Sequence, residues 1–255
     1  MQHVAGRLKL NSKQTNSNDL LHTQIILPNN YFDDMSKKPG ERELEDNVIH
    51  WLLEEENPPV RYLTLTKLLQ KPETDSEVQQ AKARLMEYNL TQGILKHSTE
   101  FWKDDDRAYW KYTGKYWQLI FVGQFMADGK DPRIAEGVHD RLNKRKWVMK
   151  SGGQCLTANL LAAFMRLGYG DHPVVIEEIE SLANRVIADS GIKCTVMDYS
   201  LLSHCYMALP KLLLCFGEIP QEKRSAVVKS AIELIAKTLV AHQVYVYVPA
   251  HRKEW

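Results

Sequence analysis

Residues 151–175, SGGQCLTANLLAAFMRLGYGDHPVV, decide the fold. Within them, residues 155–167 are apolar on every face of a helix, and the glycines and proline of GYGDHP end that helix. Residues 174–189 follow with apolar side chains on one helical face only. A helix that is apolar all round must be covered on all sides, whereas an amphipathic helix covers its neighbour with one face and exposes the other to water. The stretch therefore predicts an inner helix followed by an outer helix.

The same alternation recurs along the chain with a period of roughly 40 to 57 residues, which is typical of helical repeats. The predicted inner helices are 60–69, 116–127, 155–167 and 199–216, and the predicted outer helices are 75–89, 131–147, 174–189 and 223–242. The sequence thus predicts an all-α fold of inner–outer hairpins over residues 41–242. Such hairpins build either an open solenoid or a closed double ring, and the scarcity of charges on the inner helices favours the ring.

The two ends of the chain differ from this repeat region. Residues 1–40 are predicted to be a polar extension, disordered at least over 11–18, because they lack the apolar content of a packed core. Residues 243–255 are predicted to be an extended tail, in which QVYVYV (243–248) alternates as in a short strand.

Composition excludes several classes of protein. The 255 residues carry a net charge of +1, so no overall field attracts nucleic acid. No apolar segment of a signal peptide occurs in the first 24 residues. The longest apolar stretch, 199–216, is interrupted by His204, Pro210 and Lys211, which argues against a transmembrane segment. With no export signal, the four cysteines are expected to be reduced, and the protein is expected to be cytoplasmic.

Two motifs carry a resemblance to a known family. GG-x-C-x3-N-x2-A-x5-GYGDHP (152–173) and YTGKYWQLIFVGQFMADGKDPRI (112–134) resemble repeats of the prenyltransferase and squalene-cyclase superfamily. They are most similar to its uncharacterised bacterial and archaeal "prenyltransferase/squalene oxidase repeat" proteins, and PPVRYLTLTKLL (58–69) and SHCYMALPKLL (203–213) fit the same group. The resemblance covers roughly residues 46–242. It implies an α/α toroid, the terpenoid cyclase fold, with parallel inner helices around a central cavity.

The chain departs from that family in chemistry and in length. In WKDDDRAYW (102–110), Lys103 stands where the first acid of a D-x-D-D cyclase motif would be, so whether the protein is an enzyme stays open and no catalytic residue is assigned. Asp104, Asp105 and Asp106 are predicted to form a charged loop tip in water. Four hairpins are fewer than a closed ring of this kind needs, which predicts either missing C-terminal repeats or completion by another chain in an oligomer.

A hydrophobic small molecule, with isoprenoids as one candidate class, is the ligand that such a cavity implies. Its predicted walls are apolar and aromatic, with a few directional polar groups. The candidate cavity residues are Tyr116, Trp117, Gln118, Asn159, Tyr199, His204 and Tyr206. The alternative interpretation is that the aromatic residues pack one repeat on the next, in a scaffold that binds a protein partner and catalyses nothing.

A zinc site is a third hypothesis, because protein prenyltransferases of this superfamily hold catalytic zinc with Asp, Cys and His at such a location. The candidate ligands are Cys155, Cys194, Asp198 and His204, which parallel inner helices would bring to one end of the cavity. The competing interpretation makes Asp198 a helix N-cap and the cysteines ordinary core residues.

The pair Gly152-Gly153 also has two interpretations. Backbone amides at a helix start bind anions, and a basic segment with Arg141 and Lys144 precedes the pair, which would suit a diphosphate. The favoured interpretation is a tight turn between an outer and an inner helix, for which glycine permits a left-handed backbone.

Overall fold

The computed structural model describes residues 46–97, 102–106, 108–144, 153–188, 205 and 207–241. The chain divides into two units, Met1–Leu44 and Glu45–Trp255, and the description below concerns the second unit. All regular structure in the described residues is helical, and no strand occurs among them. The predicted all-α fold is therefore confirmed. The predicted N-terminal extension (1–40) and C-terminal tail (243–255) lie outside the described residues.

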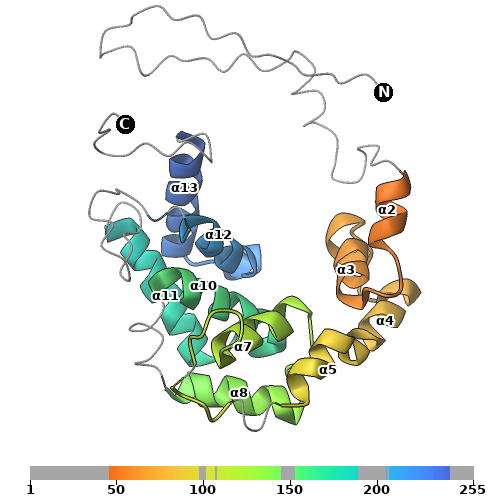
Figure 1. Ribbon diagram of the computed structural model, residues 1–255. Coiled ribbons are helices and arrows are strands. Elements are labelled where there is room, and N and C mark those ends of the chain that lie inside the picture. Colours follow the sequence, from red (N-terminus) through yellow and green to blue (C-terminus); the bar gives the residue numbers. More distant parts are fainter. Residues whose placement is uncertain are drawn as a thin grey trace, which may run out of the picture. The chain divides into compact units, whose positions relative to one another are not determined.

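The order of the helices along the chain can be followed in Figure 1. The α-helices are α2 (Asp46–Leu52), α3 (Pro58–Leu63), α4 (Ser76–Ala83), α5 (Asn89–Leu95), α7 (Lys115–Gln124), α8 (Pro132–Asn143), α10 (Gly153–Phe164), α11 (Pro173–Ala188), α12 (Leu209–Gly217) and α13 (Ala226–Ala241). The short helical turns are η1 (Thr64–Leu68), η2 (Leu85–Glu87), η3 (Met165–Tyr169) and η4 (Gln221–Lys223). Both π-helical turns, η1 and η3, extend the C-terminal end of a predicted inner helix.

Helices α7, α10 and α12 form an inner layer. Helix α10 packs against α7 on one side and against α12 on the other, and it buries ten of its twelve residues (Figure 1). Each inner helix is covered by the outer helix that follows it in the chain, α8 on α7, α11 on α10 and α13 on α12. The outer helices α11 and α13 also pack on each other. The predicted alternation of inner and outer helices is therefore what places the main hydrophobic core between two layers.

The inner helices run parallel, with their C-terminal ends at the same edge of the layer. Gly123, near the end of α7, lies so close to Ala163, near the end of α10, that an added Cβ would be 2.6 Å from the Ala163 Cβ. At the same edge, Arg166 after α10 pairs with Glu218 at the end of α12, at 2.6 Å. Since both contacts join the late residues of one helix to the late residues of the next, neighbouring inner helices point the same way.

The end of each of the first three inner helices has a left-handed residue. Gln70, Met126 and Gly168 have φ values of 52°, 56° and 89°. At α7 the amide of Met126 bonds to the Gly123 carbonyl and that of Ala127 bonds to the Val122 carbonyl, which is the Schellman arrangement. The reversal satisfies the last carbonyls and sends the chain toward the outer layer.

A side chain caps the start of each outer helix. Asp75, Asp131 and Ser225 accept from backbone amides at the starts of α4, α8 and α13, and His172 Nδ1 does so at α11. Such caps satisfy amides that have no partner within the helix. The start predicted at Asp131 and Pro132 is confirmed.

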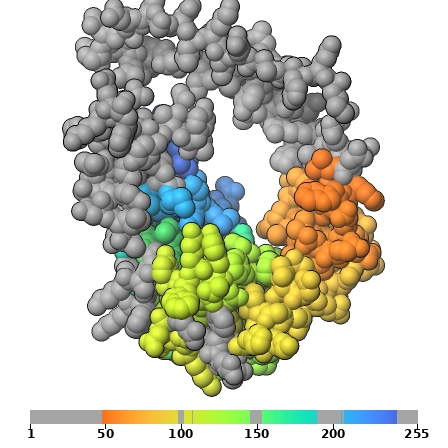
Figure 2. All heavy atoms as spheres, viewed as in Figure 1, coloured from red at the N-terminus to blue at the C-terminus, as the bar shows by residue number. Residues whose placement is uncertain are grey.

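The first hairpin has its own small core of Tyr62, Leu65, Val78, Ala81 and Leu85. Its outer segment differs from the single helix predicted over 75–89, because the chain bends at η2 and continues as α5. Helix α5 reaches α7, and the yellow and yellow-green atoms of this region join without a break in Figure 2.

A strap at residues 102–110 precedes α7. Trp102 is fully buried, donates from Nε1 to the Arg133 carbonyl at 2.6 Å, and lies against Gly137 of α8. Side-chain atoms of Trp102 would be 2.6 Å from a Cβ added at Gly137, so only glycine leaves room for the ring there.

The last inner helix is shorter than predicted. Helix α12 begins at Leu209 with Pro210 in its first turn, a position where the missing proline N–H needs no partner. Residues 207 and 208 form a turn, and 199–204 and 206 lie outside the described residues. The segment 199–216 is therefore interrupted next to Pro210, as expected of a proline within a predicted helix.

None of the helices in the described part of the chain combines the length and the apolar content needed to cross a lipid bilayer.

Candidate functional site

The inner layer has one face that the outer helices do not cover, here called the open face. Its side chains are half-buried or exposed, although they belong to helices whose other faces are packed. They are Trp117, Phe121 and Phe125 around α7, Cys155 and Asn159 on α10, and Met207, Pro210 and Leu214 around α12. On each helix these residues recur three or four positions apart, which places them along one side of a helix.

Aromatic rings dominate the α7 part of the open face. Trp117, Phe121 and Phe125 follow one another at i, i+4 and i+8, with ring centroids 6.2 and 6.4 Å apart. Tyr112 meets Trp117 edge to face at 5.0 Å, and Tyr88 meets Phe125 edge to face at 5.2 Å. These five rings, the aromatic stripe, form a connected apolar surface. Since aromatic side chains are normally buried in a core or an interface, a half-exposed stripe of them indicates a binding surface.

The α12 part of the open face is also apolar. Met207 is 66% exposed and Leu214 is 41% exposed. Leu213 is half-buried and packs against the core, whereas Leu212 beside it is fully buried. On the neighbouring helix α10, Leu161 is buried in the core.

Polar groups on the open face are few. Asn159 is half-buried, and its side-chain amide makes no hydrogen bond with any described residue. The indole Nε1 of Trp117 is enclosed without an acceptor among the residues that the structure describes. An enclosed donor without a partner carries a free-energy penalty. Because this nitrogen is enclosed, the side-chain amide of Asn159 is the polar group of the two that a ligand on the open face would meet.

Two of the predicted cavity residues, Trp117 and Asn159, are half-buried on the neighbouring inner helices α7 and α10. Tyr116 lies instead within the core, beneath the guanidinium of Arg141 at 5.0 Å, and its pKa is raised by burial. Gln118 is half-buried and donates to the Tyr112 carbonyl at 2.7 Å. This hydrogen bond joins α7 to the segment that precedes it. Tyr199, His204 and Tyr206 lie outside the described residues.

The zinc hypothesis rests mostly on residues that are not described. Cys155 is half-buried at the start of α10, while Cys194, Asp198 and His204 lie outside the described residues. Among the described ranges, no group of three or more His, Cys, Asp or Glu side chains is placed to hold a metal ion. Cys215, in α12, is fully buried, and burial raises the pKa of its thiol.

The acidic strap is tied to the core and is not simply a loop tip in water. Lys115 is buried at the start of α7, where its ammonium group donates to Asp105 at 2.5 Å, to Asp140 at 3.0 Å and to the Trp102 carbonyl at 2.8 Å. Lys144 bridges the same two carboxylates, at 2.8 Å each. The hydrogen bond from Lys115 and then that from Lys144 lower the pKa of Asp105. Asp106 is exposed, as predicted for a solvated acid, and the Asp105 side chain, although held by two lysines, is 44% exposed.

The backbone at the start of α10 is consistent with the predicted tight turn at the glycine pair. Gly153 is buried with φ at 64°, the left-handed backbone that the favoured interpretation of the glycine pair requires, and Gly152 lies outside the described residues. The nearby Arg141 is 1% exposed, and burial lowers its pKa. Its Nη1 donates to the Lys144 carbonyl at 2.8 Å, so this guanidinium stabilises the C-terminal end of α8.

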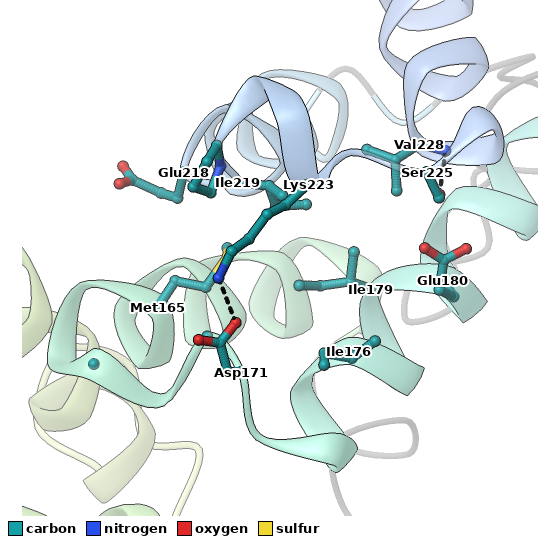
Figure 3. Close-up of a pocket in the computed structure, with 13 residues that line it drawn as sticks. Met165, Asp171, Ile176, Ile179, Glu180, Glu218, Ile219, Lys223, Ser225 and Val228 are labelled. Carbon is teal, nitrogen blue, oxygen red and sulfur yellow. Dashed lines mark hydrogen bonds and ion pairs between the residues drawn. The ribbon is translucent and has the colours of Figure 1, made fainter.

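A second site, which the sequence does not predict, lies at the edge where the inner helices end. It is a pocket of about 400 Å³ between the η3 turn, α11 and the segment from Glu218 to Val228 (Figure 3). Apolar side chains of Met165, Ile176, Ile179 and Ile219 line it beside charged ones. The sequence gives one signal for this pocket, which is that the turns GYGDHP and GEIP each follow an inner helix. The two turns can be expected to lie close together only if those helices are known to be parallel.

Comparison of the chain with protein-family models, with curated proteins and with solved structures gave no match.

Proposed function

We propose that the protein binds a hydrophobic small molecule of the isoprenoid class on the open face of its inner layer. The observation that carries this proposal is the aromatic stripe on α7, which keeps three core-type side chains half-exposed on a helix otherwise packed on its neighbours. Each aromatic or aliphatic side chain that a ligand covers contributes on the order of 1–3 kcal/mol of burial.

A terminal hydroxyl suits the polar groups of this face. Asn159 offers an amide, and Trp117 Nε1 has no acceptor among the described residues. A long, flexible prenyl chain would lie over the rings, while its hydroxyl would hydrogen-bond to the side-chain amide of Asn159. A few directional groups in an apolar wall are what small-molecule sites usually contain.

We further propose that the inner layer belongs to an α/α toroid of the prenyltransferase and squalene-cyclase type. Parallel inner helices, each covered by the following outer helix, support this proposal. In a toroid the open face is the cavity wall, so the two proposals concern the same surface. The proposal concerns binding and assigns no reaction, because Lys103 stands where the first acid of the cyclase motif would be.

Equilibrium binding of farnesol, followed by the rise in melting temperature with ligand concentration, tests the proposed function. Phe121→Ala should weaken binding about tenfold, because it removes one ring from the contact. Tyr109→Ala is the matched control: Tyr109 is 40% exposed on the strap, outside the stripe. Equal affinity in both variants, or no binding by the parent protein, would contradict the proposal.

A scaffold that binds a protein partner is the second candidate, favoured by the exposure of Met207 and Leu214. A partner helix would need the α12 part of the open face as well as the stripe. Leu214→Lys should therefore abolish partner binding but leave farnesol binding on α7 largely intact.

A further inference from the structure

The pocket at the C-terminal edge of the inner layer combines an apolar lining with one carboxylate that lacks a counter-charge. Of the charged groups that line it, Glu218 pairs with Arg166 and Asp171 pairs with Lys223 at 2.9 Å. The remaining charge is Glu180 of α11, which is half-buried and has neither an ion pair nor a side-chain hydrogen bond with any described residue. Glu180 is therefore the one charged side chain of the lining without a partner of opposite charge among the described residues.

We propose that this pocket is a binding site for a small amphipathic amine, with the ammonium group on Glu180 and the apolar part between Ile176, Ile179 and Ile219. Its volume of about 400 Å³ lies within the usual range for small-molecule sites. In Figure 3, Glu180 points into the end of the pocket near Ser225 and Val228, away from the pair of Lys223 with Asp171. Ile176 and Ile179 lie on α11 beside Glu180, so an apolar surface adjoins the carboxylate, as an amphipathic amine requires.

The pocket has an entrance that can widen at little cost. Lys223 and Asp171 are joined across the mouth, and their side chains are 56% and 84% exposed. Water and salt screen an exposed ion pair of this kind, so it contributes little to stability. A ligand can therefore displace the lysine without losing much stability of the fold.

Ile176 allows a sharp test, because it precedes Glu180 by one helical turn and is 47% exposed. In Ile176→Lys, the new ammonium would reach Glu180 as an i, i+4 pair and occupy the place of the ligand's amine. The exposure of residue 176 means that this variant should fold. Glu180→Gln removes the charge, and Glu136→Gln on the exposed side of α8 is the matched control.

Calorimetric titration with n-octylamine and with n-octanol at neutral pH decides the question. The parent protein should bind one octylamine saturably, at least tenfold tighter than octanol. In Glu180→Gln, the affinity for octylamine should fall to the affinity for octanol. Ile176→Lys should abolish octylamine binding, and Glu136→Gln should leave the octylamine affinity unchanged. The proposal is overturned if the parent shows no saturable octylamine binding, or if Glu180→Gln binds it as well as the parent. Farnesol binding should be the same in all these proteins, so failure here is distinct from failure of the proposed function.

Discussion

Single residues at the ends of helices fix the direction of the chain, and their backbone angles can be tested separately from packing. Gly168 has φ at 89°, and nothing lies within 4 Å of a Cβ added there. Gly93, inside α5, also has nothing within 4 Å of an added Cβ, and its helical backbone suits any residue.

Alanine at these two glycines should therefore have opposite effects. Gly168→Ala should destabilise the protein by about 1–2 kcal/mol, because a Cβ strains the left-handed backbone. Gly93→Ala should stabilise it by about 0.5–1 kcal/mol, because alanine favours a helix interior. Urea unfolding measures both, and a change of the same sign in the two variants would show that the turn at Gly168 is wrongly described.

Asp105 is the residue whose charge state should affect stability in acid. Its pKa is lowered in the folded protein by Lys115 and Lys144. A carboxyl with a lowered pKa stabilises the fold above its unfolded pKa of about 4, and that stabilisation is lost as the pH falls from about 5 toward the lowered value.

Asp105→Asn should thus lower stability at neutral pH by about 1 kcal/mol and make its loss on acidification shallower. Asp106→Asn, on the exposed neighbour, is the control and should follow the parent protein. Unfolding free energies measured from pH 7 to pH 3 give the comparison. If Asp105→Asn and the parent lose stability in parallel, then the network around Lys115 is not formed.

At the scale of helices, hydrophobic periodicity predicts which elements exist but not how each begins or ends. The pattern around 151–175 gives α10 and α11 correctly, since a fully apolar segment followed by an amphipathic one has only one stable pairing. It misses the break between α4 and α5, because the bend at η2 depends on how Leu85 packs into the small N-terminal core. It also misses the role of Asp105, because Lys115 joins this strap residue to Asp140, which is distant in the sequence.

The close approach of α7 and α10 depends on small residues where the helices touch. Gly123→Ala should cost about 1–3 kcal/mol, because the new Cβ would lie 2.6 Å from the Ala163 Cβ and the helices must separate. Adding Ala163→Gly should recover part of that loss, so the two changes should not be additive. A double-mutant cycle by thermal or urea unfolding measures the coupling, and strict additivity would argue that the two helices do not meet at these residues.

At the scale of the molecule, the sequence predicts the layers better than the sites. The inner layer follows from apolar content alone. Trp117 and Asn159, predicted to line a cavity, lie half-buried on the open face, and their role in binding stays a prediction. The core position of Tyr116 could not be predicted, because its ring turns toward Arg141 by tertiary packing and not by periodicity. The pocket around Glu180 could not be predicted either, because it forms between turns about 50 residues apart in the repeat.

Fluorine NMR of the protein labelled with 5-fluorotryptophan tests ligand binding at the open face most directly. The chain has six tryptophans, of which Trp117 lies in the aromatic stripe while Trp102 is buried against α8. Replacing each by Phe assigns its signal. Farnesol should shift the Trp117 signal saturably and leave that of Trp102 in place. A Trp117 signal that does not move at farnesol concentrations which shift other tryptophans, or no shift of any signal, would contradict binding on the open face.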